Sequence, residues 1–219
     1  MRRVRSARAL AIGPRALLLD EPLSALDVSI RAAMRRDLRA MLDDFAGPRL
    51  IVTHDLLDAY ALADRLVIIE DGRVTQEGSI GDVTARPRTA YAADLAGVNV
   101  LSGTLDRQHA TVTTPTGATI HVTPTDARGD AVLVAIRPQA VALSLDHPHG
   151  SQRNVWAMEA TTAESIPGTD RIRVGLGAVA AGAPESLVAE VTAATVAEFD
   201  LVPGRRVWAA VKATDVAAY

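Results

Sequence analysis

The sequence predicts an α/β region over residues 1–97, followed by an all-β region over residues 98–219. Two observations lead to this prediction. Up to Gly97, short apolar runs alternate with helix-like segments, the order typical of a largely parallel sheet. Beyond Gly97, short segments rich in β-branched residues are separated by Gly, Pro, Asp and Asn, as they are in barrels and sandwiches.

In the first region, the helix-like segments end at Gly, Pro or polar clusters, which are common helix stops. They cover residues 4–11, 28–44, 55–63, 80–85 and 89–95. The longest has an apolar stripe that predicts one buried face, formed by Ile30, Met34, Leu38, Met41 and Leu42. Ser24 and Asp27 are its candidate N-cap residues.

Four strands are expected between these helices. Residues 17–19 and 50–52 are wholly apolar, which predicts strands buried on both faces. Residues 66–69 and 74–77 flank Asp71-Gly72, a dipeptide that favours a tight hairpin turn. In the second region, strands are expected at residues 111–113, 119–122, 131–136, 155–158, 171–174, 187–191 and 207–211.

The composition of the 219 residues excludes several classes of function. The chain has no cysteine, so disulfides and thiolate metal sites are excluded. No run approaches the roughly 18–20 apolar residues of a membrane-spanning helix. A net charge of −3 and only 3% aromatic residues disfavour nucleic-acid binding, which needs basic patches and stacking platforms.

The chemically richest segment is the run of three leucines at residues 17–19 with the Asp20-Glu21-Pro22 that follows it. In open α/β sheets, ligands bind at the carboxyl ends of the strands. Adjacent residues on a strand point to opposite faces, so Asp20 and Glu21 can do different work. Taken alone, the pattern is more typical of a strand that runs into a solvated turn than of a catalytic site.

Neighbouring motifs decide between these interpretations. Over about sixty residues, the chain resembles the second half of the ATP-binding subunit of ABC transporters, a P-loop NTPase. The matching segments are Leu19-Asp20-Glu21-Pro22 for the Walker B strand, Ser24-Ala25-Leu26-Asp27 for the D-loop, Thr53-His54-Asp55 for the H-loop, and Ala63-Asp64-Arg65-Leu66, Glu70-Asp71-Gly72-Arg73 and Gln76-Glu77-Gly78 for the strands that follow.

The resemblance implies a role for each site residue. Asp20 would hold the Mg²⁺ that accompanies ATP, and Glu21 would be the catalytic carboxylate that polarises the attacking water. His54 would contact the γ-phosphate, and Asp27 would reach across the interface of an ATPase dimer. Phosphoryl transfer depends mainly on positioning and charge stabilisation, which suits such a set of side chains.

Other parts of the family's nucleotide site have no match in these residues. The 219 residues contain no Gly-x-x-x-x-Gly-Lys-Ser/Thr phosphate loop, glutamine-bearing loop or Leu-Ser-Gly-Gly-Gln signature. The match resumes at Ala7-Arg8-Ala9-Leu10-Ala11, which resembles the helix after the signature. We therefore expect this chain alone neither to bind ATP tightly nor to hydrolyse it. A start assigned too late or a shortened gene is favoured over a separately encoded half.

The second region resembles the small oligonucleotide-binding-like barrels called TOBE domains, and residues 150–219 resemble the molybdate-binding Mop module. The matches are Ser151-Gln152-Arg153-Asn154-Val155 and Val211-Lys212-Ala213-Thr214-Asp215-Val216. The resemblance suggests Ser151, Arg153, Lys212 and Thr214 as ligands of molybdate or tungstate. Solvated edge residues or a surface ion pair explain the same side chains equally well.

The leading interpretation is the ATP-hydrolysing subunit of an ABC importer for molybdate or a related oxyanion. The resemblance implies a homodimer on membrane permease subunits at the cytoplasmic face of the membrane, supplied indirectly by a substrate-binding protein. One alternative is a non-catalytic oxyanion-binding or regulatory protein that acts through the β region. Another keeps the ATPase but changes the cargo to sulfate, iron, polyamine or sugar.

Overall fold

The computed structural model describes residues 14–219, and the chain divides into two compact units, Met1–Thr84 and Ala85–Tyr219. The helix expected at residues 4–11 lies outside the described residues. In the described part, no helix is long and apolar enough to cross a membrane. The sequence-based domain boundary near Gly97 stays a prediction.

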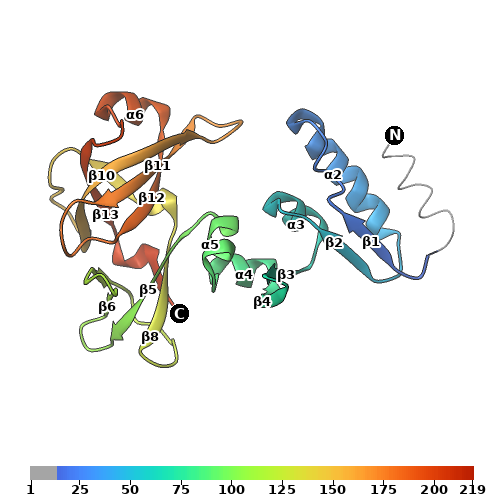
Figure 1. Ribbon diagram of the computed structural model, residues 1–219, viewed down its shortest axis with the longest axis horizontal. Coiled ribbons are helices and arrows are strands. Elements are labelled where there is room, and N and C mark those ends of the chain that lie inside the picture. Colours follow the sequence, from blue (N-terminus) through green and yellow to red (C-terminus); the bar gives the residue numbers. More distant parts are fainter. Residues whose placement is uncertain (1–13) are drawn as a thin grey trace. The chain divides into compact units, whose positions relative to one another are not determined.

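The first unit begins with a parallel pair of strands, β1 (Leu17–Asp20) and β2 (Arg49–Val52), as the alternating pattern predicts (Figure 1). Helix α2 (Val28–Asp43) connects the two strands, and helix α3 (Leu56–Leu62) follows the second. This strand–helix–strand order is the α/β architecture that the sequence predicts.

One side of this sheet is covered by helix α2. Leu38 and Leu42 of the helix are buried in a cluster with Leu17, Leu23 and Leu62. Asp27 occupies the N-cap position, but its side chain makes no capping hydrogen bond. Met34 and Met41 pack against the same cluster, so the expected stripe is confirmed from Met34 to Leu42. At its N-terminal end Ile30 lies exposed, which corrects that prediction.

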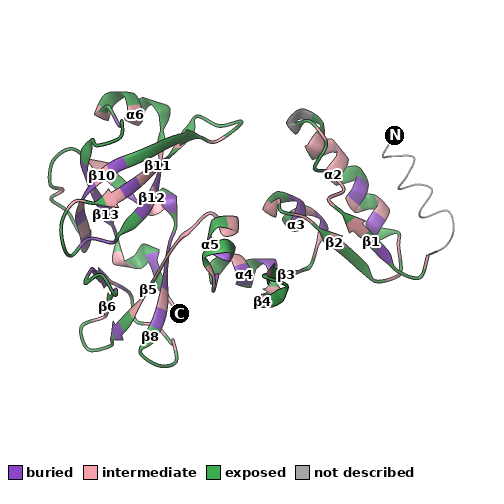
Figure 2. Cartoon of the chain, in the orientation of Figure 1, coloured by how far each residue is buried: buried purple, intermediate pink, exposed green. Residues whose placement is uncertain are grey.

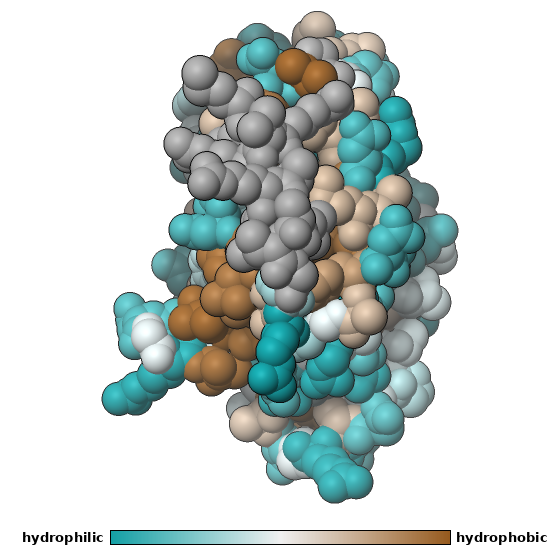
Figure 3. All heavy atoms as spheres, turned by 90° about the vertical axis from the view of Figure 1, so that its right-hand side faces the viewer, coloured by the Kyte–Doolittle hydropathy of each residue, from teal (hydrophilic) through white to brown (hydrophobic). Residues whose placement is uncertain are grey.

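The opposite side of the β1–β2 sheet is open. Leu18 is 73% exposed, Leu50 56% and Val52 52%, so the expectation that both faces are buried is wrong for this chain (Figure 2). Their neighbours along the strands point toward α2, and nothing within the described residues buries the alternate side chains. Figure 3, which views the molecule from the right-hand side of Figure 1, also shows apolar side chains gathered at the surface.

A hairpin of β3 (Arg65–Glu70) and β4 (Arg73–Ser79) completes the sheets of the first unit. Its turn residues Asp71 and Gly72 have φ angles of +50° and +73°. Two consecutive positive φ values are those of a type I′ turn, so the Asp-Gly prediction is confirmed. Helix α4 (Ile80–Ala85) follows directly.

The second unit opens with helix α5 (Ala90–Ala96), which Thr89 caps and Gly97 ends at φ +65°. Two antiparallel five-stranded sheets follow, with the orders β14-β8-β5-β6-β7 and β12-β11-β10-β13-β9. The strands are β5 (Asn99–Asp106), β6 (Thr111–Thr113), β7 (Thr119–His121), β8 (Ala131–Ile136), β9 (Ala142–Ser144), β10 (Asn154–Ser165), β11 (Arg171–Ala178), β12 (Ser186–Thr192), β13 (Arg206–Val211) and β14 (Val216–Ala218).

The two sheets are copies of one plan. Each uses four successive strands, followed by a 3₁₀ turn, η1 (Pro138–Ala140) or η2 (Ala213–Asp215). The next strand then crosses to the other sheet: β9 pairs with β13, and β14 pairs with β8. The sequence retains traces of the duplication, with identical residues at Val132/Val207, Ala135/Ala210, Val141/Val216 and Ala142/Ala217.

The inner faces of both sheets share one apolar core. Fully buried side chains from the two copies, such as Val134, Ile136, Met158, Leu176 and Val211, pack in the same cluster. Helix α6 (Ala193–Phe199) joins β12 to β13 and places Val196 and Phe199 against it. The all-β, OB-like prediction for this region is confirmed.

Candidate functional site

The carboxyl ends of β1 and β2 bring two of the sequence motifs together. The parallel register pairs Asp20 with Val52, and the Glu21 amide donates to the Val52 carbonyl at 2.9 Å. The residues after both strands therefore emerge at the same sheet edge. This places Asp20 and Glu21 from one motif beside Thr53 and His54 from the other.

Glu21 and His54 form a direct contact at this edge. The His54 Nδ1 lies 2.7 Å from Glu21 Oε1. Glu21 adopts φ +45°, a conformation that costs a non-glycine residue roughly 1–2 kcal/mol. The turn that follows holds it there, because the Ser24 hydroxyl and amide both donate to the Glu21 carbonyl.

The electrostatics of the pair favour the protonated imidazole. The hydrogen bond to the Glu21 carboxylate, followed by the Coulomb attraction of the same group, raises the pKa of His54 above its usual 6.5. His54 is 73% exposed and Glu21 33% exposed, so both can meet a ligand from solution. The site thus presents an imidazole that a carboxylate holds and whose protonated form that carboxylate favours.

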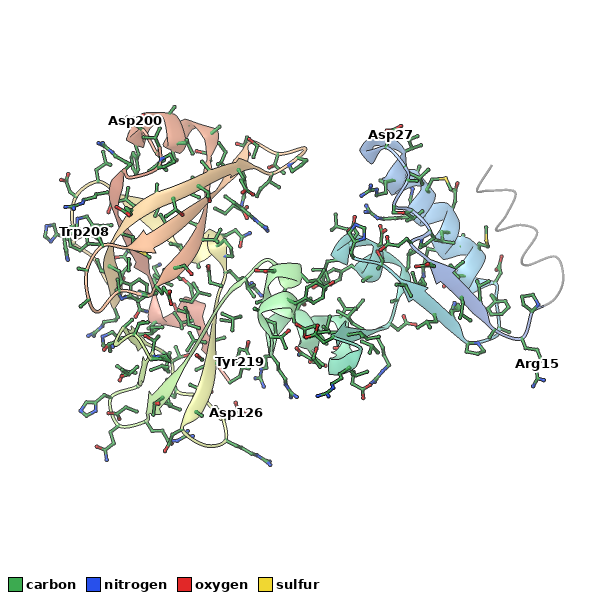
Figure 4. All side chains as sticks on the ribbon, viewed as in Figure 1. Arg15, Asp27, Asp126, Asp200, Trp208 and Tyr219 are labelled. Atoms are coloured by element: carbon green, nitrogen blue, oxygen red, sulfur yellow. The ribbon has the colours of Figure 1, made fainter. Side chains whose placement is uncertain are left out.

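Asp20 and Asp27 occupy different positions around this pair. Asp20 ends β1 and is exposed at the same sheet edge. Asp27 is also exposed and immediately precedes α2, where Figure 4 labels it. A single carboxylate of the Asp20 type suits Mg²⁺, which is usually bound through one or two carboxylates plus substrate phosphates and water. Among the described residues, no three acidic or histidine side chains form a metal cluster of their own.

The structure adds charged residues that the sequence analysis did not single out. Arg31 and Arg35 of α2 both contact Asp55 Oδ2 at 3.2 Å, and Arg35 also contacts Asp58 at 2.5 Å. The four-residue spacing of the arginines places them on one helix face. That spacing was the available signal, but the partner carboxylates lie about twenty residues away.

The candidate anion residues of the second unit also come together. The antiparallel rung between Asn154 and Val211 places Arg153 next to Lys212 at the same end of β10 and β13. Both cationic side chains are exposed, and within residues 14–219 neither has an ion-pair partner. Ser151 lies two residues before Arg153 and Thr214 two residues after Lys212, and both are exposed as well.

Asn154 anchors this end of the strands. Its buried side-chain amide donates to the His121 carbonyl at 2.9 Å and accepts from the His121 amide at 2.7 Å. The duplicated Asn99 does the same with Val188, whose amide donates to it at 2.6 Å. Each asparagine therefore ties its own sheet to the edge strand of the other.

Comparison with known proteins shows that the TOBE domain model matches residues 150–218, and that several import ATP-binding proteins are similar to the chain. The chain is 36% identical to the molybdenum import ATP-binding protein ModC of Mycobacterium tuberculosis, over 99% of this chain and 58% of the relative. It is 36% identical to the spermidine/putrescine import ATP-binding protein PotA of Trichormus variabilis, over 70% of this chain and 42% of the relative. It is 38% identical to the sulfate/thiosulfate import ATP-binding protein CysA 1 of Chromobacterium violaceum, over 68% of this chain and 41% of the relative.

The chain thus spans from 41% to 58% of the length of these curated relatives. All three relatives are import ATP-binding proteins, although their named cargoes differ.

Proposed function

Since the chain is homologous to the ATP-binding subunits of ABC importers and carries a TOBE domain, we propose that it supplies the hydrolytic half of an importer ATPase site. The observation that carries this proposal is the 2.7 Å contact between His54 and Glu21 at the carboxyl ends of two parallel strands. An imidazole and a carboxylate in contact at that edge suit a reaction driven by positioning and charge stabilisation.

Each side chain would have a separate task. Bound Mg²⁺–ATP would supply the triphosphate and the charge on its phosphates. Asp20 would bind the metal ion, and Glu21 would accept a hydrogen bond from the attacking water and orient it. His54, held by Glu21, would donate a hydrogen bond to the γ-phosphate. Asp27 would lie at the interface with a second ATP-binding subunit.

The grip on the triphosphate would come from a segment other than the residues described above. The 219 residues hold no phosphate-loop motif, whose backbone N–H groups and lysine bind phosphates. The open apolar face with Leu18, Leu50 and Val52 supports this proposal, because such a surface is normally buried in an intact α/β sheet. The chain alone would therefore bind ATP weakly and leave it unhydrolysed.

A chimera tests this assignment. In it, the 219 residues replace the matching residues of the M. tuberculosis relative, so that the remaining part of that protein supplies what is lacking here. The chimera is expected to hydrolyse Mg²⁺–ATP, whereas the 219-residue chain alone is expected to show no turnover. A well-folded chimera that binds Mg²⁺–ATP but gives no turnover would contradict the proposal.

For the cargo, we propose molybdate or a related tetrahedral oxyanion. Arg153 and Lys212 supply two adjacent positive charges without a counter-ion among the described residues, and Ser151 and Thr214 add hydroxyl donors. Charge-assisted hydrogen bonds of this kind are the strong ones for oxyanions. The molybdenum import relative aligns at 36% identity over 99% of this chain, and a spermidine/putrescine import relative aligns at 34% identity over 94%, so the preference for an anion rests on the charges of Arg153 and Lys212.

Calorimetric titration of the chain with sodium molybdate, with sodium sulfate in parallel, tests this assignment. Lys212→Gln is expected to weaken molybdate binding about tenfold or more, since one charged hydrogen bond is lost. Arg107→Gln is the matched control, because Arg107 donates to backbone carbonyls in the other copy of the fold. Absence of molybdate binding would reject the anion site and leave the ATPase proposal in place.

The assembly would follow from the same homology. We expect two copies to associate as an ATPase dimer against membrane permease subunits on the cytoplasmic side, with a substrate-binding protein acting upstream. A second candidate function, regulation through anion binding without catalysis, is favoured by the completeness of the second unit. Molybdate binding that Mg²⁺–ATP leaves unchanged in the chimera would support that second function.

A further inference from the structure

A network of charged side chains connects the segment before Asp27 with the turn at His54 and Asp55. The Arg31 guanidinium donates through Nη2 to the Leu26 carbonyl at 3.2 Å and through Nη1 to Asp55 Oδ2 at 3.2 Å. Leu26 directly precedes Asp27, and Asp55 directly follows His54. One side chain therefore contacts the neighbour of each of two proposed functional residues.

The other carboxylate oxygen of Asp55 accepts hydrogen bonds from the first turn of helix α3. This oxygen, Oδ1, accepts from the Leu57 amide at 2.8 Å and from the Asp58 amide at 3.4 Å, so it caps helix α3. Since Oδ2 binds Arg31 and Arg35, the carboxylate fixes the turn at His54 to both α3 and α2. Its side chain is only 22% exposed, which keeps solvent from screening these contacts fully.

Arg35 closes the network one turn further along α2. Its Nη2 contacts Asp55, and its Nε contacts the carboxylate of Asp58, a residue that is only 3% exposed. A nearly buried carboxylate must be paired to be tolerated, so this contact is expected to persist. The guanidinium is planar and has several donors, which lets each arginine join two acceptors where a lysine would reach one.

We propose that Arg31 and Arg35 are positioning residues that hold the Leu26–Asp27 backbone and the His54–Asp55 turn as one rigid unit. This inference rests on the proposed ATPase function, whose regulation it concerns. A displacement of His54 on contact with a γ-phosphate would move Asp55, and through Arg31 the Leu26 carbonyl and Asp27. The state of the nucleotide site would thereby reach the residue proposed to face the second subunit.

The test is made by NMR on the 219-residue chain without nucleotide. Asp55→Asn removes the charge that holds the arginines but retains a good helix cap. It is expected to shift the Leu26 carbonyl ¹³C and Asp27 amide ¹⁵N signals and to speed exchange of the Leu26 amide about tenfold, through local opening. The Leu57 amide in the capped turn is expected to stay protected.

Two further variants complete the design. Arg31→Lys leaves the Arg35–Asp55 contact and the cap in place, and it is expected to move the same Leu26 and Asp27 signals. Arg39→Gln is the matched control, because Asp43, on the same helix, is the one ion-pair partner that Arg39 has among residues 14–219. It is expected to leave these signals unchanged. If Asp55→Asn lowers the melting temperature, the proposal is judged on Arg31→Lys, because that variant retains the helix cap.

Unchanged Leu26 and Asp27 signals in both Asp55→Asn and Arg31→Lys would overturn the proposal. The same would hold if Arg39→Gln moved them equally, because the effect would then be one of general helix charge. None of these signals requires bound ATP, so this failure is separate from that of the ATPase assignment, which the chimera tests.

Discussion

The two units of the molecule differ in how completely they bury their own apolar surface. In the second, two five-stranded sheets exchange their last strands and enclose one core, in which Ile120, Val134 and Val211 have no exposed surface. In the first, two separate two-stranded sheets leave Leu18, Leu50 and Val52 open. The second unit thus buries its apolar core with its own strands. The first unit has the candidate residues Glu21 and His54 at one sheet edge and leaves an apolar face uncovered.

This difference teaches that motif and fold can be separated in one chain. The Glu21–His54 pair forms from local register between β1 and β2, which needs only those two strands and the turns after them. Burial of the same strands on their second face needs another layer. The chain can therefore bring the candidate residues Glu21 and His54 into contact while its first unit remains only partly covered.

The largest expected effect comes from removing a core side chain of the second unit. Leu176→Ala should lower the free energy of unfolding by about 3 kcal/mol, because Leu176 is 1% exposed and a cavity would remain. Leu18→Ala should change stability by less than about 0.5 kcal/mol. Urea unfolding followed by the buried Trp156 and by far-UV circular dichroism measures both. Equal losses would mean that the chain already covers the Leu18 face.

A smaller effect should come from the asparagines that tie the two sheets together. Asn154→Ala leaves the His121 amide and carbonyl without their partner and should cost about 2–3 kcal/mol. Asn99→Ala, at a half-buried position, should cost less. The exposed Gln108→Ala serves as the control in the same urea series. Loss at Asn154 alone, with none at Asn99, would argue against equivalent roles in the two copies.

The smallest effect in stability concerns two histidine–carboxylate pairs with the same 2.7 Å contact, His54–Glu21 and His109–Asp106. His54 has a raised pKa, so its pair stabilises the fold below pH 6.5, and this contribution disappears as the pH rises through the raised value. The hydrogen bond from His109 lowers the pKa of Asp106, so that pair contributes above about pH 3.8 and is lost as the pH falls through the lowered value.

NMR titration of the imidazole signals distinguishes the two pairs. Glu21→Gln should move the pKa of His54 back toward 6.5, because the hydrogen bond and the charge that raise it are both removed. Asp106→Asn should leave the pKa of His54 unchanged. A raised pKa of His54 that persists in Glu21→Gln would show that another group holds the proton.

Sequence patterns predicted the elements that depend on neighbours in the chain. The Asp71-Gly72 hairpin and helix α4 match their expected positions, since turn chemistry and capping are local. Strands β9 and β14 were not predicted, because three residues carry little periodicity and their pairing partners belong to the other copy. Strand β5 was obscured by Gly103, where a side chain would meet Val112 and the Thr113 carbonyl.

The candidate site shows the same division. Asp20, Glu21 and His54 could be identified from motifs, whereas the Arg31 and Arg35 network required the three-dimensional pairing with Asp55 and Asp58. The open face at Leu18 and Leu50 could not be predicted either. An apolar run indicates which residues prefer burial, but not whether the chain supplies the surface that buries them.

The most direct test of the account is the rate of ATP hydrolysis by the chimera when Glu21 is changed. Glu21→Gln is expected to lower kcat at least about 100-fold, as loss of a group that orients the attacking water does. Asp106→Asn, which breaks a histidine pair of the same geometry in the second unit, is expected to leave kcat unchanged. Full activity in Glu21→Gln would contradict the assignment of the β1–β2 edge as the site of hydrolysis.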